Sequence, residues 1–162
     1  SSGLKKFRGA KRRLEFIGDA HGILVLDDYA HHPLEIKATI RALKETYTSD
    51  RRLIVVFQPQ RFTRTKFLFD RFAKAFALAD IVIITDIYHI GTGEHPLPGV
   101  TGERLTEAIK ENSNPNTIFI KDFDGIIQTL NRLAKPNDIV VTMGAGNINN
   151  AAIEFVQRMK NK

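Results

Sequence analysis

The densest group of side chains able to do chemistry is the segment 27–33, which reads Asp-Asp-Tyr-Ala-His-His-Pro. It follows a short apolar run and precedes a helical pattern. One of its aspartates can simply cap that helix, and a histidine pair suggests a metal. Adjacent side chains diverge, however, and no third ligand stands at a suitable spacing. The segment therefore predicts a polar binding site rather than a metal site.

A second candidate is the segment 57–65, Phe-Gln-Pro-Gln-Arg-Phe-Thr-Arg-Thr. Arg61 and Arg64 stand three apart where a helix is expected to begin, and free N–H groups and the helix dipole favour an anion there. Guanidinium groups suit two-pronged binding of a carboxylate or phosphate. Helix starts normally favour acidic residues, so two arginines indicate an anion site. The alternative is a solvated turn capped by Thr63 or Thr65.

A third segment, 144–148, reads Gly-Ala-Gly-Asn-Ile. It is neither a Walker A loop nor a full Gly-x-Gly-x-x-Gly fingerprint. Two interpretations remain open, a close approach of backbone to a phosphate and a tight turn made for packing. A fourth segment is the Gly- and Pro-containing loop 88–99, where Glu94 and His95 are available as acid, base or ligand. Its length makes it a plausible flexible edge to a site.

Apolar periodicity predicts the elements that position these segments. The expected strands are 14–17, 23–26, 53–57, 81–85, 117–120 and 138–142, and the expected helices are 33–47, 67–78, 102–111, 123–134 and 148–160. This alternation predicts a single doubly wound α/β domain, with a mostly parallel, Rossmann-like sheet and helices on both faces. The opening pair of strands can add an antiparallel edge strand. In such sheets ligands lie beyond the carboxyl ends of the strands, where the candidate segments fall.

The composition fits one globular domain, with 162 residues, 43% of them hydrophobic and 26% charged. No apolar run approaches the roughly 20 residues that span a bilayer, and no leader pattern is present. We therefore expect a cytoplasmic protein without a membrane partner. The absence of cysteine excludes disulfides and thiolate metal sites.

The net charge of +6 belongs to the first 13 residues, which hold six Lys and Arg and no acidic residue. The rest of the chain holds 18 basic and 18 acidic residues and is formally neutral. A nucleic-acid binder more often spreads its positive charge over a face, so we expect no nucleic-acid partner. The opening Ser-Ser-Gly is interpreted as a tag remnant.

In this order, the segments resemble the muramyl ligases, the ATP-dependent amide ligases that build the peptide stem of peptidoglycan precursors. The resemblance runs from about Phe7 to the end and rests on 11–16 (Lys-Arg-Arg-Leu-Glu-Phe), 27–33, 56–65 and 144–148. The Gln-Pro-x-Arg-x-Thr-Arg-Thr segment resembles the alanine-adding branch rather than the branch that recycles murein tripeptide. The resemblance makes residues 1–13 a tag remnant and basic interdomain linker, and residues 14–162 the C-terminal α/β domain.

The resemblance implies the reaction of the alanine-adding branch, which joins L-alanine to UDP-N-acetylmuramate with ATP and magnesium. ATP phosphorylates the muramoyl carboxylate to give an acyl phosphate and ADP, and the amine of L-alanine then attacks the acyl phosphate to release phosphate. The resemblance implies that an amino-terminal domain binds the UDP-sugar. It also implies that a central domain carries the phosphate-binding loop and is the main holder of the magnesium ion. This domain would close over ATP and the amino acid. Because the chain has no phosphate loop of its own, we expect it to be inactive alone.

On the nucleotide side, the resemblance implies roles for three residues. Arg13 resembles the linker arginine that reaches the ribose or phosphates. Asp28 matches the aspartate that binds the ribose hydroxyls, and Tyr29 lies where the family lines the adenine or amino-acid pocket. No residue of this chain is expected to bind metal.

On the reacting side, the resemblance implies three catalytic residues. Arg61 and Arg64 match the pair that holds the alanine carboxylate or the reaction's phosphate, and His31 matches the histidine beside the pocket. Gln60 departs from the family, which commonly has histidine there, and glutamine cannot become cationic.

Two other classes of function stay open. One is a free-standing nucleotide- or anion-binding regulatory module, and the other is a nucleic-acid-associated protein that uses the basic arm. A reading frame that begins well upstream and encodes a Walker loop would favour the ligase. Binding to nucleic acid with a steep salt dependence would favour the nucleic-acid-associated protein.

Overall fold

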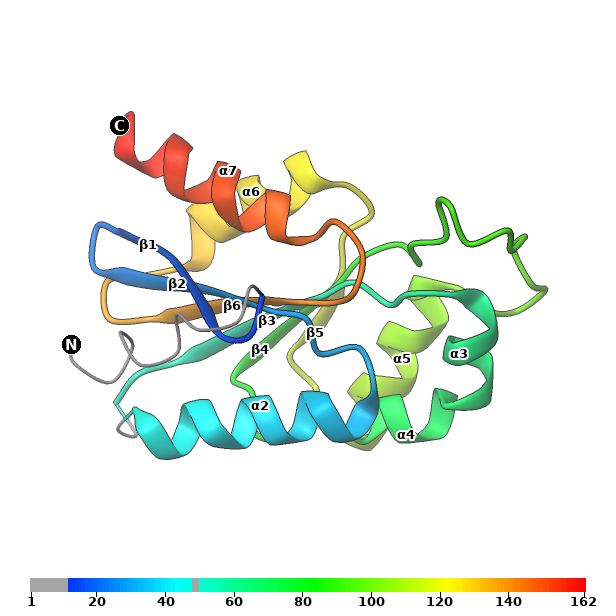
Figure 1. The fold of residues 1–162 in the computed structure, drawn as a ribbon. Coiled ribbons are helices and arrows are strands. Elements are labelled where there is room, and N and C mark those ends of the chain that lie inside the picture. Colours follow the sequence, from blue (N-terminus) through cyan, green and yellow to red (C-terminus); the bar gives the residue numbers. More distant parts are fainter. Residues whose placement is uncertain (1–11, 48–49) are drawn as a thin grey trace.

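A six-stranded sheet runs through the middle of the molecule, with helices on both of its faces (Figure 1). The structure is a computed structural model, and it describes residues 12–47 and 50–162. Its strands are β1 (Glu15–Ala20), β2 (Ile23–Asp28), β3 (Leu53–Phe57), β4 (Ile81–Ile84), β5 (Thr117–Phe119) and β6 (Ile139–Met143). They lie in the order β1-β2-β6-β3-β4-β5. β1 pairs antiparallel with β2 and the other pairs are parallel, which confirms the predicted fold class and its antiparallel edge.

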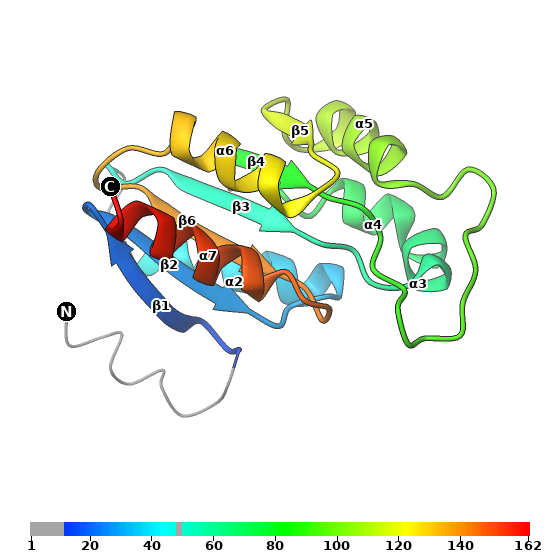
Figure 2. The same cartoon turned by 90° about the horizontal axis from the view of Figure 1, so that it is seen from above.

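Two layers of helices cover the sheet, as the view from above also shows (Figure 2). The helices are α2 (Pro33–Thr46), α3 (Phe62–Phe67), α4 (Phe69–Ala73), α5 (Gly102–Asn112), α6 (Phe123–Leu133) and α7 (Asn149–Lys160). Apolar side chains of α2, α4 and α5 form one core cluster against the sheet. Those of α6 and α7 form a second cluster on the opposite face.

Strand β3 shows why the sheet needs both layers. All five of its residues are buried, and side chains alternate between the two faces of a strand. Leu53, Val55 and Phe57 belong to the cluster under α2 and α4. Ile54 and Val56 belong to the cluster under α6 and α7. A continuous apolar run is therefore the pattern of a strand covered on both sides.

The segment after β3 corrects one predicted element. A single helix over 67–78 was expected, but helical structure begins at Phe62 and is divided at Leu68, whose ψ of 16° leaves helical geometry. Phe67 is consequently 89% exposed. Phe72 and Phe76 pack against Phe57, with ring centroids 5.5 and 5.6 Å apart, and hold this segment on the sheet.

The opening strands are longer than the sequence predicts. They reach a tight turn at His21 and Gly22, whose φ angles of 54° and 86° are both in the left-handed region. Two such residues match the right-handed twist of a hairpin. β1 and β2 therefore run the full length from Glu15 to Asp28 on either side of this turn.

The carboxyl ends of the parallel strands fall in one line across the sheet. Asp28 pairs with Met143 and Met143 with Phe57, while Phe57 pairs with Ile84 and Ile84 with Phe119. Every loop that carries candidate residues therefore leaves the sheet at the same edge. β6 lies between β2 and β3, so the Gly-containing turn after β6 separates the loops that follow the other two strands.

Candidate functional site

Asp27 and Asp28 end β2, and they differ in their partners. Asp27 is fully buried. One of its oxygens accepts the Thr142 hydroxyl at 2.6 Å, and the other accepts Nε of Arg12 at 2.9 Å. A buried carboxylate is tolerated only when it is paired and hydrogen-bonded, and both conditions are met here.

Arg12 uses its whole guanidinium group in this cluster. Besides the contact with Asp27, Nη1 donates to the Gly146 carbonyl at 2.8 Å and Nη2 to the Gly144 carbonyl at 2.7 Å. The same group lies over the Tyr29 ring, 5.2 Å from its centroid. Arg12 therefore ties the chain before β1 to the end of β2 and to the turn after β6.

The sequence pointed to Arg13 rather than to Arg12. Arg13 is exposed, and its predicted contact with a nucleotide stays a prediction. The sequence does contain an indication of the Arg12 ion pair, because three consecutive basic residues precede the first strand. A buried carboxylate at the end of the neighbouring strand needs a cation, and one of these three residues can provide it. The other basic residues of the arm lie outside the described residues.

Asp28 holds the loop that follows it. Its carboxylate accepts the backbone N–H groups of Leu14 at 2.9 Å and Ala30 at 2.8 Å, and Oγ1 of Thr39 lies 3.5 Å away. Burial raises the pKa of the Asp28 carboxyl above its ordinary value, against the lowering effect of these hydrogen bonds. Asp28 is therefore a structural residue as well as a candidate ligand for ribose.

Tyr29 and His31 form the open part of the same cluster. Tyr29 is 44% exposed, and its ring meets that of His31 edge-on at 5.3 Å. Nδ1 of His31 lies 3.0 Å from the Tyr29 carbonyl oxygen. His32 instead caps α2, accepting from the Leu34 N–H, while Glu35 accepts from His32 N–H in a capping box. The helix cap is thus His32 and not an aspartate.

The turn after β6 is packed tightly against the loop after β3. The Gln58 and Asn147 side chains are 2.9 Å apart, and the Asn147 N–H donates back to Gln58 Oε1 at 3.0 Å. A Cβ added at Gly144 would lie 2.7 Å from the Gln58 carbonyl oxygen. Packing therefore explains the glycines, which was one of the two interpretations left open.

Gly146→Ala is expected to lower the free energy of unfolding of this chain by about 1–3 kcal/mol, the usual cost of overpacking. The new Cβ would lie 2.5 Å from Gln58 Oε1 and 2.7 Å from the Tyr88 ring. Urea unfolding measures the change. Gly91→Ala is the control, because its Cβ meets nothing within 4 Å and reports only the cost of a φ of 77°. An unchanged urea midpoint in Gly146→Ala would contradict the packing explanation.

Arg61 and Arg64 flank the start of α3. Arg61 is the N-cap residue with a φ of 70° and makes no side-chain capping bond, and neither threonine takes that place. The Thr65 hydroxyl donates to the Arg61 carbonyl at 2.8 Å, and Nη1 of Arg64 lies 3.5 Å from the Gln60 carbonyl. Both guanidinium groups therefore lie on one short turn at the carboxyl edge of the sheet.

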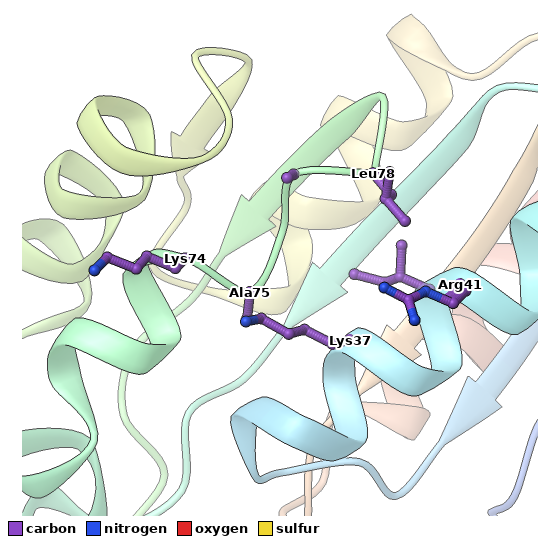
Figure 3. A pocket seen from close by; sticks show the side chains of 7 residues that line it. Lys37, Arg41, Lys74, Ala75 and Leu78 are labelled. Carbon is purple, nitrogen blue, oxygen red and sulfur yellow. The ribbon is translucent and has the colours of Figure 1, made fainter.

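Two hollows help to locate the site. One, of about 220 Å³, lies at the carboxyl ends of β3 and β4 and is lined in part by Gln58, Tyr88, Lys121 and Asn147. The other, of about 300 Å³, lies between α2 and the segment 74–78 that leads into the amino end of β4 (Figure 3). None of the predicted site residues lines either hollow, but the first lies at the carboxyl edge of the sheet, beside the Gln58 and Asn147 contact described above.

Two further properties of the described residues concern metal binding and membrane spanning. Across 12–47 and 50–162, no group of three His, Cys, Asp or Glu side chains is placed to bind a metal ion. Within the same ranges no helix combines the length and apolarity needed to cross a membrane.

Comparison with known proteins adds to this geometry. A family model described as "Mur ligase, glutamate ligase domain" matches residues 12–146. The UDP-N-acetylmuramate–L-alanine ligase of Pelotomaculum thermopropionicum is 46% identical over 160 residues, which is 99% of this chain and 34% of that protein. The chain therefore spans about a third of the length of the curated relatives it matches.

Solved structures agree on the fold. The UDP-N-acetylmuramate–alanine ligase of Thermotoga maritima is similar with a TM-score of 0.72 and 26% identity, covering 99% of this chain and 32% of that one. A murein peptide ligase of Psychrobacter arcticus is similar with a TM-score of 0.75 and 29% identity, with the same coverage of 99% and 32%.

Proposed function

The chain belongs to the Mur ligase family as a glutamate ligase domain, and from this premise we propose that it is the C-terminal domain of an ATP-dependent ligase that joins L-alanine to UDP-N-acetylmuramate. The observation that carries the proposal is 46% identity over 99% of the chain to a protein named for that reaction. The predicted anion-binding segment 57–65, which resembles that of the alanine-adding branch, supports it from the sequence.

The residues at the end of β2 fit a nucleotide. Tyr29 offers a half-exposed aromatic face, on which a purine can stack. Beside it, the Asp28 carboxylate retains acceptor capacity beyond its two short backbone bonds. We propose that Asp28 binds ribose, that Tyr29 lines the base and that His31 fixes the edge of the Tyr29 ring. Arg13, exposed beside them, is proposed to reach the ribose or phosphates.

The residues at the start of α3 suit the reacting groups. We propose that Arg61 and Arg64 hold the carboxylate of L-alanine or the charge that develops at phosphate, because positioning and charge stabilisation dominate phosphoryl transfer. ATP supplies the phosphoryl group that activates the muramoyl carboxylate. Magnesium and the UDP-sugar are assigned to the rest of the protein, with residues 1–13 as linker and 14–162 as this domain. The cytoplasm is the proposed compartment, since ATP is available there.

Expression of the full-length protein tests the proposal. We expect ADP release that requires both UDP-N-acetylmuramate and L-alanine. Murein tripeptide in place of L-alanine is the key comparison, because a murein peptide ligase has the same fold. Faster ADP release with the tripeptide would overturn the choice of L-alanine.

Arg64→Lys in the full-length protein is expected to raise KM for L-alanine about tenfold, equivalent to about 1.4 kcal/mol, while KM for ATP changes less than about twofold. Lysine keeps the charge but loses the two-pronged geometry that suits a carboxylate. Steady-state kinetics with each substrate varied gives both values. Arg71→Lys, on the exposed side of α4, is the control. Equal increases in both KM values would assign Arg64 to the phosphates instead.

A further inference from the structure

Glu94 lies in the loop between β4 and α5, and its carboxylate contacts the start of α3. Oε2 accepts the Phe62 N–H at 2.7 Å, and Oε1 accepts the Thr63 hydroxyl. Oε1 also lies 3.7 Å from Nε of Arg61. The Glu94 side chain is only 15% exposed, whereas that of Arg61 is 47% exposed. A residue 33 positions beyond Arg61 therefore gathers two hydrogen bonds and an ion pair at one turn.

These contacts compensate for a weak point in the backbone. Arg61 has a φ of 70° and provides no side-chain cap for α3. A non-glycine residue keeps such a φ only when its surroundings hold it there. The Arg61 N–H donates to the Tyr88 carbonyl at 3.1 Å, and its own carbonyl accepts the Thr65 hydroxyl at 2.8 Å. Glu94 adds the third restraint, on the side chain.

The ion pair leaves the outer end of the Arg61 guanidinium group available. The Glu94 carboxylate faces Nε of Arg61. Among residues 12–47 and 50–162, neither Nη group of Arg61 has a hydrogen-bond partner. Those Nη groups include the donors that bind a carboxylate in two-pronged fashion. Hydrogen bonding from Thr63 lowers the pKa of Glu94, so the carboxylate stays ionised near neutral pH and is unsuited to proton transfer.

We propose that Glu94 is a positioning residue: it orients the Arg61 guanidinium group so that its Nη donors face the anionic group of the amino-acid substrate. The inference rests on the proposed function and deepens it, because it assigns a task to the loop 88–99. Glu94 itself touches Arg61 and α3 and not the substrate. Its removal therefore acts through the affinity of Arg61 for the substrate's anionic group.

The test uses two variants of the full-length protein. Glu94→Gln keeps one oxygen acceptor, which can serve the Phe62 N–H while the new amide NH2 faces the Thr63 hydroxyl, and it removes the charge that faces Arg61. Glu94→Ala removes the charge and both oxygen acceptors. We expect Glu94→Gln to raise KM for L-alanine about fivefold, with KM for ATP and kcat changed less than about twofold. Glu103→Gln is the control, because it makes the same charge change at an exposed residue of α5.

A double-mutant cycle shows whether the effect passes through Arg61. In an Arg61→Lys background, Glu94→Gln is expected to have less than about a twofold effect on KM for L-alanine, because coupled residues are not additive. A fivefold effect that persists in that background would overturn the inference. So would a KM for L-alanine that does not change in Glu94→Gln. Glu94→Gln keeps the test usable if Glu94→Ala fails to fold.

Failure of this inference can be told apart from failure of the proposed function. A wild-type protein that uses another amino acid overturns the choice of L-alanine, and the Glu94→Gln effect is then measured on KM for that amino acid. A wild-type protein that uses L-alanine, with an unchanged KM in Glu94→Gln, overturns only the role of Glu94.

Discussion

Replacing Asp27 with alanine is expected to lower the free energy of unfolding of this chain by about 3 kcal/mol, near the lower end of the range for breaking a buried ion pair. The variant leaves the Arg12 guanidinium group, 13% exposed, without its counter-charge. It also leaves the buried Thr142 hydroxyl without its acceptor. The penalty comes from these unpaired groups more than from the lost attraction.

Urea unfolding followed by circular dichroism measures this loss. Asp124→Ala is the matched control, because Asp124 forms an ion pair with Arg158 at the surface, where its side chain is 72% exposed. Exposed pairs contribute little to stability, so we expect almost no change. An Asp27→Ala midpoint as close to wild type as that of Asp124→Ala would mean that the Arg12 pair is not coupled to folding.

Asp28→Ala is expected to weaken ATP binding to the full-length protein by about 1–3 kcal/mol, the range for losing a hydrogen bond to a charged group. That loss corresponds to a roughly 5- to 150-fold rise in Kd for ATP, measured by isothermal titration calorimetry. The structure complicates the interpretation, because Asp28 also holds the Leu14 and Ala30 backbone. A loss of affinity alone would therefore not separate ribose binding from loop structure.

Asp122→Ala provides the needed comparison. Asp122 is the N-cap of α6, and its carboxylate accepts the Gly125 N–H at 2.8 Å. Its loss is expected to cost about 1 kcal/mol of stability, as other N-caps do, at the same edge of the sheet but without a proposed ATP contact. If Asp122→Ala weakens ATP binding as much as Asp28→Ala does, the ribose assignment is wrong.

The strands of the sheet could be predicted because each is marked by a short run of apolar residues that are adjacent in the sequence. The run Leu53–Phe57 is apolar at every position, and its alternate side chains belong to the core clusters on the two faces of the sheet. The break at Leu68 could not be predicted, since apolar residues continue at helical spacing on both sides of it. There, packing of Phe72 and Phe76 on Phe57 decides where the helix lies.

In the candidate site too, groups of neighbouring residues could be predicted, whereas contacts between distant segments could not. Asp28, Tyr29 and His31 form one cluster as their adjacency suggests, and Arg61 and Arg64 share one turn. Whether these residues bind ATP and L-alanine stays a prediction. Arg12 and Glu94 were not assigned, because each acts on residues far along the chain. Arg12 contacts Gly146 across 134 positions, and such contacts follow from the strand order rather than from spacing.

The Arg12 contacts have a mechanical consequence for the proposed enzyme. Its guanidinium group is fixed at the turn after β6, and its carbonyl accepts the Tyr29 N–H at 2.5 Å. Arg12 is therefore an anchor: a force applied to the chain at residue 12 would be carried by the same backbone and side chains that are proposed to hold the nucleotide.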